Sequence, residues 1–457
     1  MHVDVLVAEI GSTTTVINAF SFDQSAQEPR LLGQGSHPTT VEEGDVRVGL
    51  KGALKSLEGA LGVKTLSWNE MLACSSAAGG LRMSVHGLVY DMTVKAANEA
   101  ALGAGAVVKM VTAGELSDTD LRKLVDLNPN IVLLAGGVDY GERRTVLANA
   151  RRLGELDLEV PVIYAGNVAC RDEIAEILGP ETLMVENVYP GIDRLNVEPA
   201  RRAIQEVFEK HIVTAPGMGG VRDMVSGEIM PTPGAVMEAA RLLEQELEDL
   251  MVLDVGGATT DVHSVTAGSE EIARLLTAPE PRAKRTVEGD LGVYVNASNL
   301  ADQVGHDRLE SDLGFDPAPA LESLPAVPTT EQERALILCL AREAAETAVS
   351  RHAGRLRHLY GPTGRITVAE GKDLTGIKWI VGTGGVFTRL PGSREILSSL
   401  AQLQDPYLLL PREPGILVDS HYIMAVAGVL SRRWPQQALH LLVTSLNLQK
   451  ESGKSGR

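Results

Sequence analysis

The chain has 457 residues, 44% of them hydrophobic and 22% charged, which is the balance of a globular protein and argues against a disordered or fibrous one. This length predicts two or three domains. The formal net charge of −18 repels the phosphates of nucleic acids and anionic membranes, so we expect neither as a partner.

The cysteines and the N-terminal residues indicate a protein of the cytoplasm. Cys74, Cys170 and Cys339 are scattered without a CxxC pair, so we expect neither a disulfide framework nor a zinc site. The first residues lack the basic segment of a signal peptide. The apolar runs are far shorter than the roughly 20 residues of a membrane-spanning helix.

The first elements predict a small sheet with one helix, and we assign residues 1–87 to a first domain. The expected elements are strands at residues 4–10, 14–22, 30–36 and 70–75 and a helix near 45–61. From residue 88 short apolar runs alternate with amphipathic helices, which is typical of a parallel sheet buried on both faces. Residues 88–215 are therefore expected to form a Rossmann-like α/β segment.

The second half of the chain predicts another domain and a C-terminal helix. Its parts are a connecting loop and helix (216–249), a second domain (250–418) and a C-terminal helix and tail (419–457). The acidic segment 305–328 contains four prolines and is expected to be an exposed connector. Thr330 and Glu333 form a capping box that opens a helix directly after it.

Two turns in the chain share one plan. "VAEIGSTTTVINAF" (7–20) and "VLDVGGATTDVHSV" (252–265) each contain an apolar run, an acid, a glycine, small hydroxyl residues and a second apolar run. The corresponding residues are Glu9 and Asp254, Gly11 and Gly256, Ser12 and Gly257, and Thr14 and Thr259. This duplication predicts two similar lobes, each presenting one turn.

The chemistry of these turns suits a metal-bound triphosphate. Successive amides of a tight turn form an anion-binding concavity, and glycine permits close approach and positive φ. An acid at the end of the strand suits the water shell of Mg²⁺. One such turn alone fits an ordinary polar hairpin equally well, and the pair is the stronger signal. A third turn, "VGTGGVF", contains Gly382, Gly384 and Gly385, which either receive a base and ribose or only punctuate the chain.

Several motifs together resemble the MutL/GlmL family, within the superfamily of actin, sugar kinases and seventy-kilodalton heat-shock chaperones. They are "VDVLVAEIGSTTT", "CSSAAGGLRM", "VLLAGGVD", "LDVGGATTDVHSV", "KRTVEGDLG" and "GTGGVF". The resemblance implies an α/β fold with two ribonuclease-H-like (actin-like ATPase) lobes that close on ATP, and here an inserted Rossmann-like subdomain. Members of this family are accessory proteins encoded beside adenosylcobalamin-dependent glutamate mutase and related aminomutases.

The resemblance also assigns residues to each motif. The first phosphate motif is matched by Gly11, Ser12, Thr13 and Thr14, the second by Asp254, Gly256, Gly257, Ala258, Thr259 and Asp261, and the adenosine motif by Gly382, Gly384 and Gly385. The "AVAG" stretch (425–428) matches the helix that crosses between the lobes. Glu9 replaces the usual Asp, and Ala258 replaces a frequent Gly and fits only if its φ is negative.

Acids elsewhere are weaker candidates. Glu288 and Asp290 are expected either near Mg²⁺, together with Glu9, Asp254 and Asp261, or in a solvated loop. Asp139 follows a strand, and we expect it either to act as a catalytic base for an attacking water, beside Glu9 and Asp254, or to cap a helix starting near Gly141.

The resemblance implies a slow ATPase that releases damaged cobalamin from a mutase, with ATP, ADP and Mg²⁺ as ligands. Residues 88–215 are the candidate contact for the mutase, and an oligomer is compatible with the sequence. The cobalamin-binding pattern DxHxxG is absent, so we expect no directly bound cobalamin. The alternatives are a small-molecule kinase, with Asp139 as its base, and a hydantoinase- or oxoprolinase-like ATP-dependent amidohydrolase.

Overall fold

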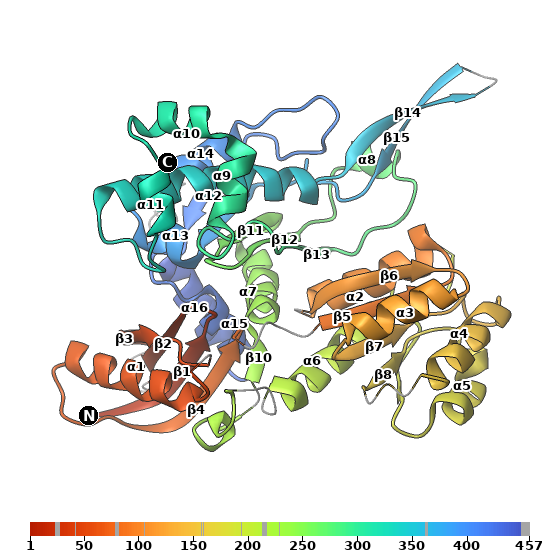
Figure 1. Cartoon of the computed structure of the whole chain (residues 1–457), viewed down its shortest axis with the longest axis horizontal. Coiled ribbons are helices and arrows are strands. Elements are labelled where there is room, and N and C mark those ends of the chain that lie inside the picture. The colour runs from red at the N-terminus through yellow and green to blue at the C-terminus, as the bar shows by residue number, and fades with distance from the viewer. Residues whose placement is uncertain are drawn as a thin grey trace, which may run out of the picture.

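The computed structural model contains two lobes, an inserted domain, and helices that pass between the lobes (Figure 1). It describes residues 1–22, 28–41, 43–77, 82–104, 106–156, 158, 160–192, 194–212, 217–227, 229–361 and 364–448. In this part of the chain, every helix is too short or too polar to span a bilayer.

The sheets of the two lobes have the same topology. Side by side, the first contains β10 (Ile229–Pro231), β4 (Ser67–Ser75), β1 (His2–Ile10), β2 (Thr14–Ser21) and β3 (Arg30–Pro38), and the second contains β17 (Gly415–Val418), β16 (Trp379–Thr383), β11 (Leu250–Val255), β12 (Thr260–Val265) and β13 (Ala283–Glu288). In each, the second strand in chain order is antiparallel to the first and third, and the last two are parallel to the first. This is the ribonuclease-H-like order, so the predicted two-lobed α/β fold is confirmed.

The central strand β1 is apolar on both sides because helices cover both faces of its sheet. Leu6, Ala8 and Ile10 pack with helix α1 (Val46–Ala60) on one face. Val5 and Val7 pack with α7 (Thr232–Leu247) and α15 (Met424–Ser431) on the other. Period-two burial toward two helical layers fixes the register of the strand, and therefore the position of the turn that follows Ile10.

The inserted domain is an all-parallel, doubly wound sheet. Its strand order is β6 (Val107–Ala113), β5 (Arg82–Gly87), β7 (Ile131–Leu134), β8 (Val162–Tyr164) and β9 (Leu183–Met184). Its helices are α2 (Lys95–Gly103), α3 (Asp118–Leu127), α4 (Arg144–Gly154), α5 (Arg171–Leu178) and α6 (Glu198–Ile212), with a π-helical turn at Tyr90–Val94. In chain order this is the 2-1-3-4-5 arrangement of flavodoxin-like folds.

The sheet pairing moves two of the predicted boundaries. The first domain does not extend to residue 87, because β5 pairs with β6 and β7 and so belongs to the inserted domain. The segment 216–249 is more than a connector, because β10 pairs with β4 and completes the first sheet. The inserted domain therefore interrupts the first lobe between its fourth and fifth strands.

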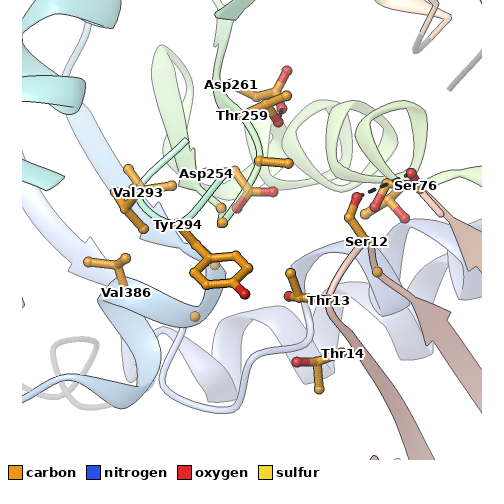
Figure 2. A pocket seen from close by; sticks show the side chains of 18 of the residues that line it. Ser12, Thr13, Thr14, Ser76, Asp254, Thr259, Asp261, Val293, Tyr294 and Val386 are labelled. Atoms are coloured by element: carbon orange, nitrogen blue, oxygen red, sulfur yellow. Dashed lines mark hydrogen bonds between the residues drawn. The ribbon is translucent and has the colours of Figure 1, made fainter. Parts of the chain in front are cut away.

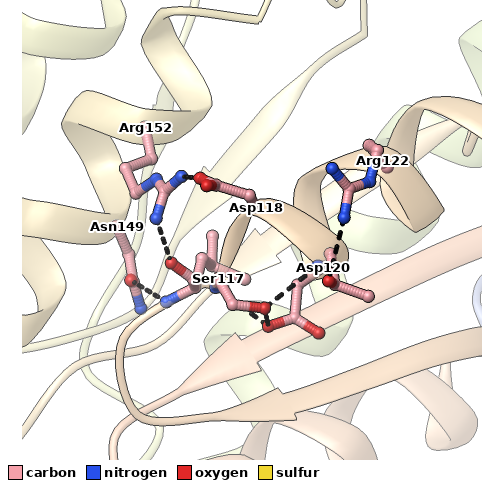
Figure 3. Close-up of polar contacts among 8 residues, drawn as sticks. Ser117, Asp118, Asp120, Arg122, Asn149 and Arg152 are labelled. Carbon is pink, nitrogen blue, oxygen red and sulfur yellow. Dashed lines mark hydrogen bonds and ion pairs between the residues drawn. The ribbon is translucent and has the colours of Figure 1, made fainter.

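Side-chain hydrogen bonds fix the loop that leads into α3 (Figure 3). Ser117 and Asp120 form a capping box at the start of the helix. The Oδ1 atom of Asn149, on α4, accepts from the Leu116 amide at 2.8 Å, and Arg152 donates to the Leu116 carbonyl at 2.7 Å. Arg152 also forms an ion pair with Asp118. The two helices on this face are thereby joined through polar contacts to one loop.

The segment 305–328 is not the plain exposed connector that its prolines predicted. It contains α10 (His306–Leu313) and α11 (Ala318–Glu322), which follow α9 (Ala297–Val304) and pack against α12 (Glu331–His352). Leu309 is 1% exposed and belongs to the core of the second lobe. The predicted capping box of Thr330 and Glu333 does open α12.

The remaining elements extend the second lobe, except for the C-terminal helix, which packs against α15 and α7. They are α8 (Glu270–Ala273), the hairpin of β14 (Arg355–Gly361) and β15 (Gly364–Glu370), α13 (Gly384–Arg389), α14 (Ser393–Ala401) and α16 (Pro435–Ser445). Short 3-10 turns occur at Val168–Cys170 and Val221–Asp223. The hairpin projects away from the body of the molecule (Figure 1).

Helices α7 and α15 cross between the two lobes at very close range. A β-carbon built on Gly428 would lie only 1.8 Å from the carbonyl oxygen of Ala235. A larger residue at this crossing would push the two helices apart. The small residues of the "AVAG" stretch therefore have the packing role that the sequence indicated.

Gly428→Ala is expected to lower the melting temperature, because the added methyl group overlaps main chain that has no room to move. Overpacking of this kind costs about 1–3 kcal/mol. The matched control is Gly59→Ala in α1, where a β-carbon meets nothing within 4 Å and alanine is the better helix former. Thermal unfolding of both variants checks the prediction, and equal melting temperatures would contradict it.

Candidate functional site

A cavity of about 620 Å³ lies between the two lobes (Figure 2). Both predicted turns line it, with Gly11–Thr14 from the first lobe and Gly256–Thr259 from the second. Gly384 and Gly385 of the third turn also line it, as do Glu9 and Asp254. The cavity therefore collects most of the residues that the sequence assigned to three separate motifs.

The two turns have the same local geometry. The amide of Gly11 donates to the Thr14 carbonyl at 3.0 Å, and that of Gly256 donates to the Thr259 carbonyl at 2.9 Å. A β-carbon on Gly11 would lie 2.7 Å from that Thr14 oxygen, so glycine is needed for the turn to close. The expected positive φ is not found at Gly11, Gly256 or Gly257. Close approach, rather than a left-handed backbone, explains these glycines.

The turns face one another across the cavity. A β-carbon on Gly257 would lie 3.5 Å from the Cγ2 atom of Thr13, so the lobes nearly touch here. The amides of Ser12, Thr13, Gly257 and Ala258 donate no hydrogen bond within the part of the chain that the structure describes. Four unpaired amides beside one cavity are suited to an anionic ligand.

A loop that the sequence did not single out holds the second turn from behind. The amides of Val293 and Tyr294 donate to the carbonyls of Gly256 and Gly257 at 3.2 and 2.9 Å, and Asn296 Nδ2 donates to the Ala258 carbonyl at 3.0 Å. Ala258 has no positive φ, so alanine is compatible with the turn. Tyr294 and Val293 also line the cavity, and Figure 2 shows the Tyr294 ring beside Thr13.

Glu9 and Asp254 are the next-to-last residues of equivalent strands, and Glu9 is buried whereas Asp254 is half-buried. Burial raises the pKa of Asp254 from 3.8 to about 8, and the negative charges of Asp261 and Glu9 add to this shift. Burial raises the pKa of Glu9 from 4.5 to about 7, against a hydrogen bond from Tyr422. A nearby cation would stabilise the ionised form of both carboxylates. Glu9 and Asp254 therefore fit a divalent metal ion that they hold through water.

Asp261 lies in the same cavity but already has protein partners. Arg285 donates to its Oδ1 atom from Nη2 at 2.6 Å and from Nε at 3.1 Å, and Thr259 Oγ1 donates to its Oδ2 atom at 3.1 Å. Arg285 is 1% exposed. Asp261 therefore orients the second turn and pairs with a buried arginine, which leaves Glu9 and Asp254 as the acids better placed for a metal.

Glu288 and Asp290 do not line the cavity. Arg351, on α12, donates to Glu288 Oε2 at 2.6 Å and to Asp290 Oδ1 at 3.0 Å. These two acids are held at the end of β13 by a cation, so their predicted metal role is not supported by their position. In the described part of the chain, no group of three or more acids, histidines or cysteines has the geometry of a metal site.

Asp139 lies outside the cavity, in the inserted domain. Its Oδ1 atom accepts from the Val168 amide and from Asn187 Nδ2, both at 2.9 Å. It lines a different pocket and cannot serve as a base in the cleft, so that prediction is wrong. The helix-cap alternative is wrong too, because α4 begins at Arg144.

The three glycines of the third turn have different surroundings. Gly384 has a φ of 88°, and a β-carbon there would lie 2.4 Å from Asp254 Oδ1, so this glycine makes room for the acid. A β-carbon on Gly385 would meet nothing within 4 Å. Gly382 lies inside β16, where a β-carbon would meet Leu397 and Phe387 at 2.8 and 2.9 Å, so its role is packing and not ligand contact.

Residues before α15 complete the site, and no sequence motif pointed to them. The hydroxyl of Tyr422 donates to Glu9 Oε1 at 3.0 Å, and the Arg389 guanidinium lies 5.3 Å from its ring centre. Asp419 is fully buried and accepts from Thr383 Oγ1 and from the Ile423 and Met424 amides. These contacts join the third turn, the crossing helix and Glu9.

Two lobes of one topology that meet at paired turns define the actin-like class of folds. The chain belongs to the MutL protein family, whose model matches residues 5–446. Protein MutL of Clostridium tetanomorphum is 37% identical over 456 residues, which cover 96% of this chain and 98% of that protein.

Solved structures match the chain only loosely. A nucleotide-free acetone carboxylase is 13% identical with a TM-score of 0.36, covering 94% of this chain and 70% of that one. The ethanolamine utilization protein EutJ of Carboxydothermus hydrogenoformans is 10% identical (TM-score 0.28; 96% and 89% covered). A carbohydrate kinase of Novosphingobium aromaticivorans is 14% identical (TM-score 0.28; 93% and 91% covered). Scores this low carry no functional argument.

The raised pKa of Asp254 predicts a pH-dependent stability. Between 3.8 and about 8 the folded protein keeps a proton that the unfolded chain has lost, so stability falls as pH rises through this window. Asp254→Asn removes this contribution and is expected to flatten the dependence of the melting temperature on pH in metal-free buffer. Asp302→Asn, on the exposed side of α9, is the control. If the melting temperatures of the wild type and Asp254→Asn change with pH in the same way, the raised pKa of Asp254 is refuted.

Proposed function

We propose that this protein is an ATPase that reactivates an adenosylcobalamin-dependent mutase by releasing damaged cobalamin from it. The observation that carries the ATPase part is the pair of matching turns that face one another with unpaired amides. Family membership supports the role of an accessory protein to a mutase.

The cavity offers a distinct place for each part of Mg-ATP. The amides and hydroxyls of the two turns receive the phosphates, and Gly385 with the apolar side chains of Val293 and Val386 receives the adenosine. A Mg²⁺ ion, held through water by Glu9 and Asp254, would neutralise phosphate charge. Tyr422 fixes the carboxylate of Glu9, which positions this acid to orient an attacking water.

The inserted domain is connected to both lobes, so closure of the lobes would move it. The main chain joins it to the first lobe at both ends, whereas α2 packs against β13 of the second. Arg285, whose other contact is Asp261 in the cavity, donates to the Leu102 carbonyl of α2 at 2.9 Å. Lys95 pairs with Glu280, and Lys372 pairs with Glu99 at 3.1 Å. A domain attached to both lobes changes its orientation when the lobes move relative to each other. Such a domain could bind a partner protein differently in the open and closed states.

The kinase alternative depended on Asp139 as its base, and that acid lies in another pocket. No observation in the described part of the chain favours the amidohydrolase alternative.

Asp254→Ala is expected to reduce ATP hydrolysis by about a hundredfold or more, because the cavity loses an acid that would hold the metal. Phosphate release with Mg-ATP and no other substrate is the measurement, with circular dichroism to show that the variant is folded. The exposed variant Asp302→Asn should hydrolyse ATP as the wild type does. Normal ATP hydrolysis by Asp254→Ala would contradict the assignment of this cavity as the ATPase site.

The reactivase role is tested with a purified adenosylcobalamin-dependent mutase loaded with inactive cyanocobalamin. The protein with Mg-ATP is expected to release the corrinoid and restore activity when fresh coenzyme is added. Glu99→Gln, which removes the negative charge paired with Lys372, is expected to retain hydrolysis and to slow release, because it weakens one of the contacts that join α2 to the second lobe. Arg144→Ala, an exposed change in the same domain, should retain both.

Failure of release in the presence of normal hydrolysis would contradict the reactivase proposal and leave the ATPase assignment standing. Release by folded Glu99→Gln at the wild-type rate would contradict the coupling through α2 instead. Hydrogen exchange of α2 with and without ATP separates these outcomes, since only a docked helix gains protection on closure.

A further inference from the structure

A second cavity, of about 340 Å³, lies in the inserted domain, away from the cleft between the lobes. Its lining residues follow the parallel strands directly: Asp139 follows β7, Val168 follows β8 and Glu186 follows β9. The cavity thus opens at the carboxyl edge of the sheet, beside β7, β8 and β9, and not at the switch point between β5 and β7 where ligands of such sheets usually bind. The volume is within the range of about 300–1,000 Å³ that small-molecule sites occupy.

The floor of this cavity is held rigidly. Asn187 is 4% exposed and donates both to the Gly137 carbonyl at 3.0 Å and to Asp139 Oδ1 at 2.9 Å. The Val168 amide is the second donor to Asp139 Oδ1. These bonds fix one oxygen of the Asp139 carboxylate, while its Oδ2 atom accepts no hydrogen bond from the described residues.

The cavity presents charges of both signs that do not pair with each other. Asp139 and Glu186 are the acids, and Arg171 and Arg194 are the bases. Within the described part of the chain none of the four forms an ion pair, although Arg171 donates to the Val185 carbonyl and Glu186 accepts from Asn196. Oppositely charged groups kept apart across a cavity lose their mutual attraction unless a ligand joins them.

The charges restrict the ligand that fits. A simple anion would be repelled by the two acids and a simple cation by the two arginines, so each would use half of the site. Among the described residues that line the cavity there is no aromatic ring on which a base or sugar could stack. A small zwitterion satisfies both pairs.

We propose that this cavity binds a free α-amino acid. The arginines Arg171 and Arg194 receive its carboxylate, and Asp139 with Glu186 receives its ammonium group. The site does not depend on the proposed ATPase, because no residue lines both cavities.

The test is calorimetric titration of the full-length protein, without nucleotide, with each of the twenty common amino acids. At least one is expected to bind saturably at one site per chain. Asp139→Asn retains the acceptor for the Val168 amide and removes the charge, and Arg194→Ala changes an exposed side chain. Each is expected to weaken binding about tenfold or more, whereas Arg144→Ala, outside the cavity, leaves it unchanged.

The probes also separate other ligand classes. For the amino acid that binds, its deaminated acid and its decarboxylated amine should each bind much more weakly, because each keeps one charge. Glucose and inorganic phosphate should not compete. Absence of binding by all twenty amino acids at millimolar concentration, binding that Asp139→Asn and Arg194→Ala leave unchanged, or tighter binding of glucose or phosphate would overturn the proposal.

Discussion

The contact between the two tight turns is the constraint on which the rest of the molecule depends. Thr13 and Gly257 lie so close that a β-carbon on the glycine would come within 3.5 Å of the threonine methyl group. That approach requires small residues at the tips of both turns. The two sheets behind the turns repeat one strand order, and the helices between the lobes approach as closely, since a β-carbon on Gly428 would lie 1.8 Å from the Ala235 carbonyl oxygen.

Sequence duplication made the centre of the site predictable. The matching positions of Glu9 and Asp254 are now seen in equivalent registers, opposite Val16 and Asp261 respectively. Local sequence patterns did not reveal contacts between residues that lie far apart in the chain. Tyr422 reaches Glu9 across 413 positions, and Arg351 turns Glu288 away from the cavity across 63. The residues on either side of these contacts contain no sequence motif from which the contacts could be predicted.

Asp139 shows a different limit. A strand, two glycines and an acid look the same whether they end a strand of a lobe or of the inserted sheet, because the carboxyl edge of any parallel strand presents the next side chain outward. Only the pairing of β5 with β6 and β7 assigns this strand to the inserted domain. The same pairing places the boundary one strand before residue 87, and the pairing of β10 with β4 makes that short segment part of the first sheet.

The interruption of the first lobe between β4 and β10 also bears on how the chain matures on the ribosome. The five strands of the inserted domain emerge together, between residues 82 and 184, whereas the first lobe lacks its last strand until Ile229–Pro231 has left the exit tunnel. Domains fold as units during synthesis. The middle of this polypeptide would thus reach its native form before its beginning, and the nascent N-terminal sheet would wait with an unpaired edge at β4.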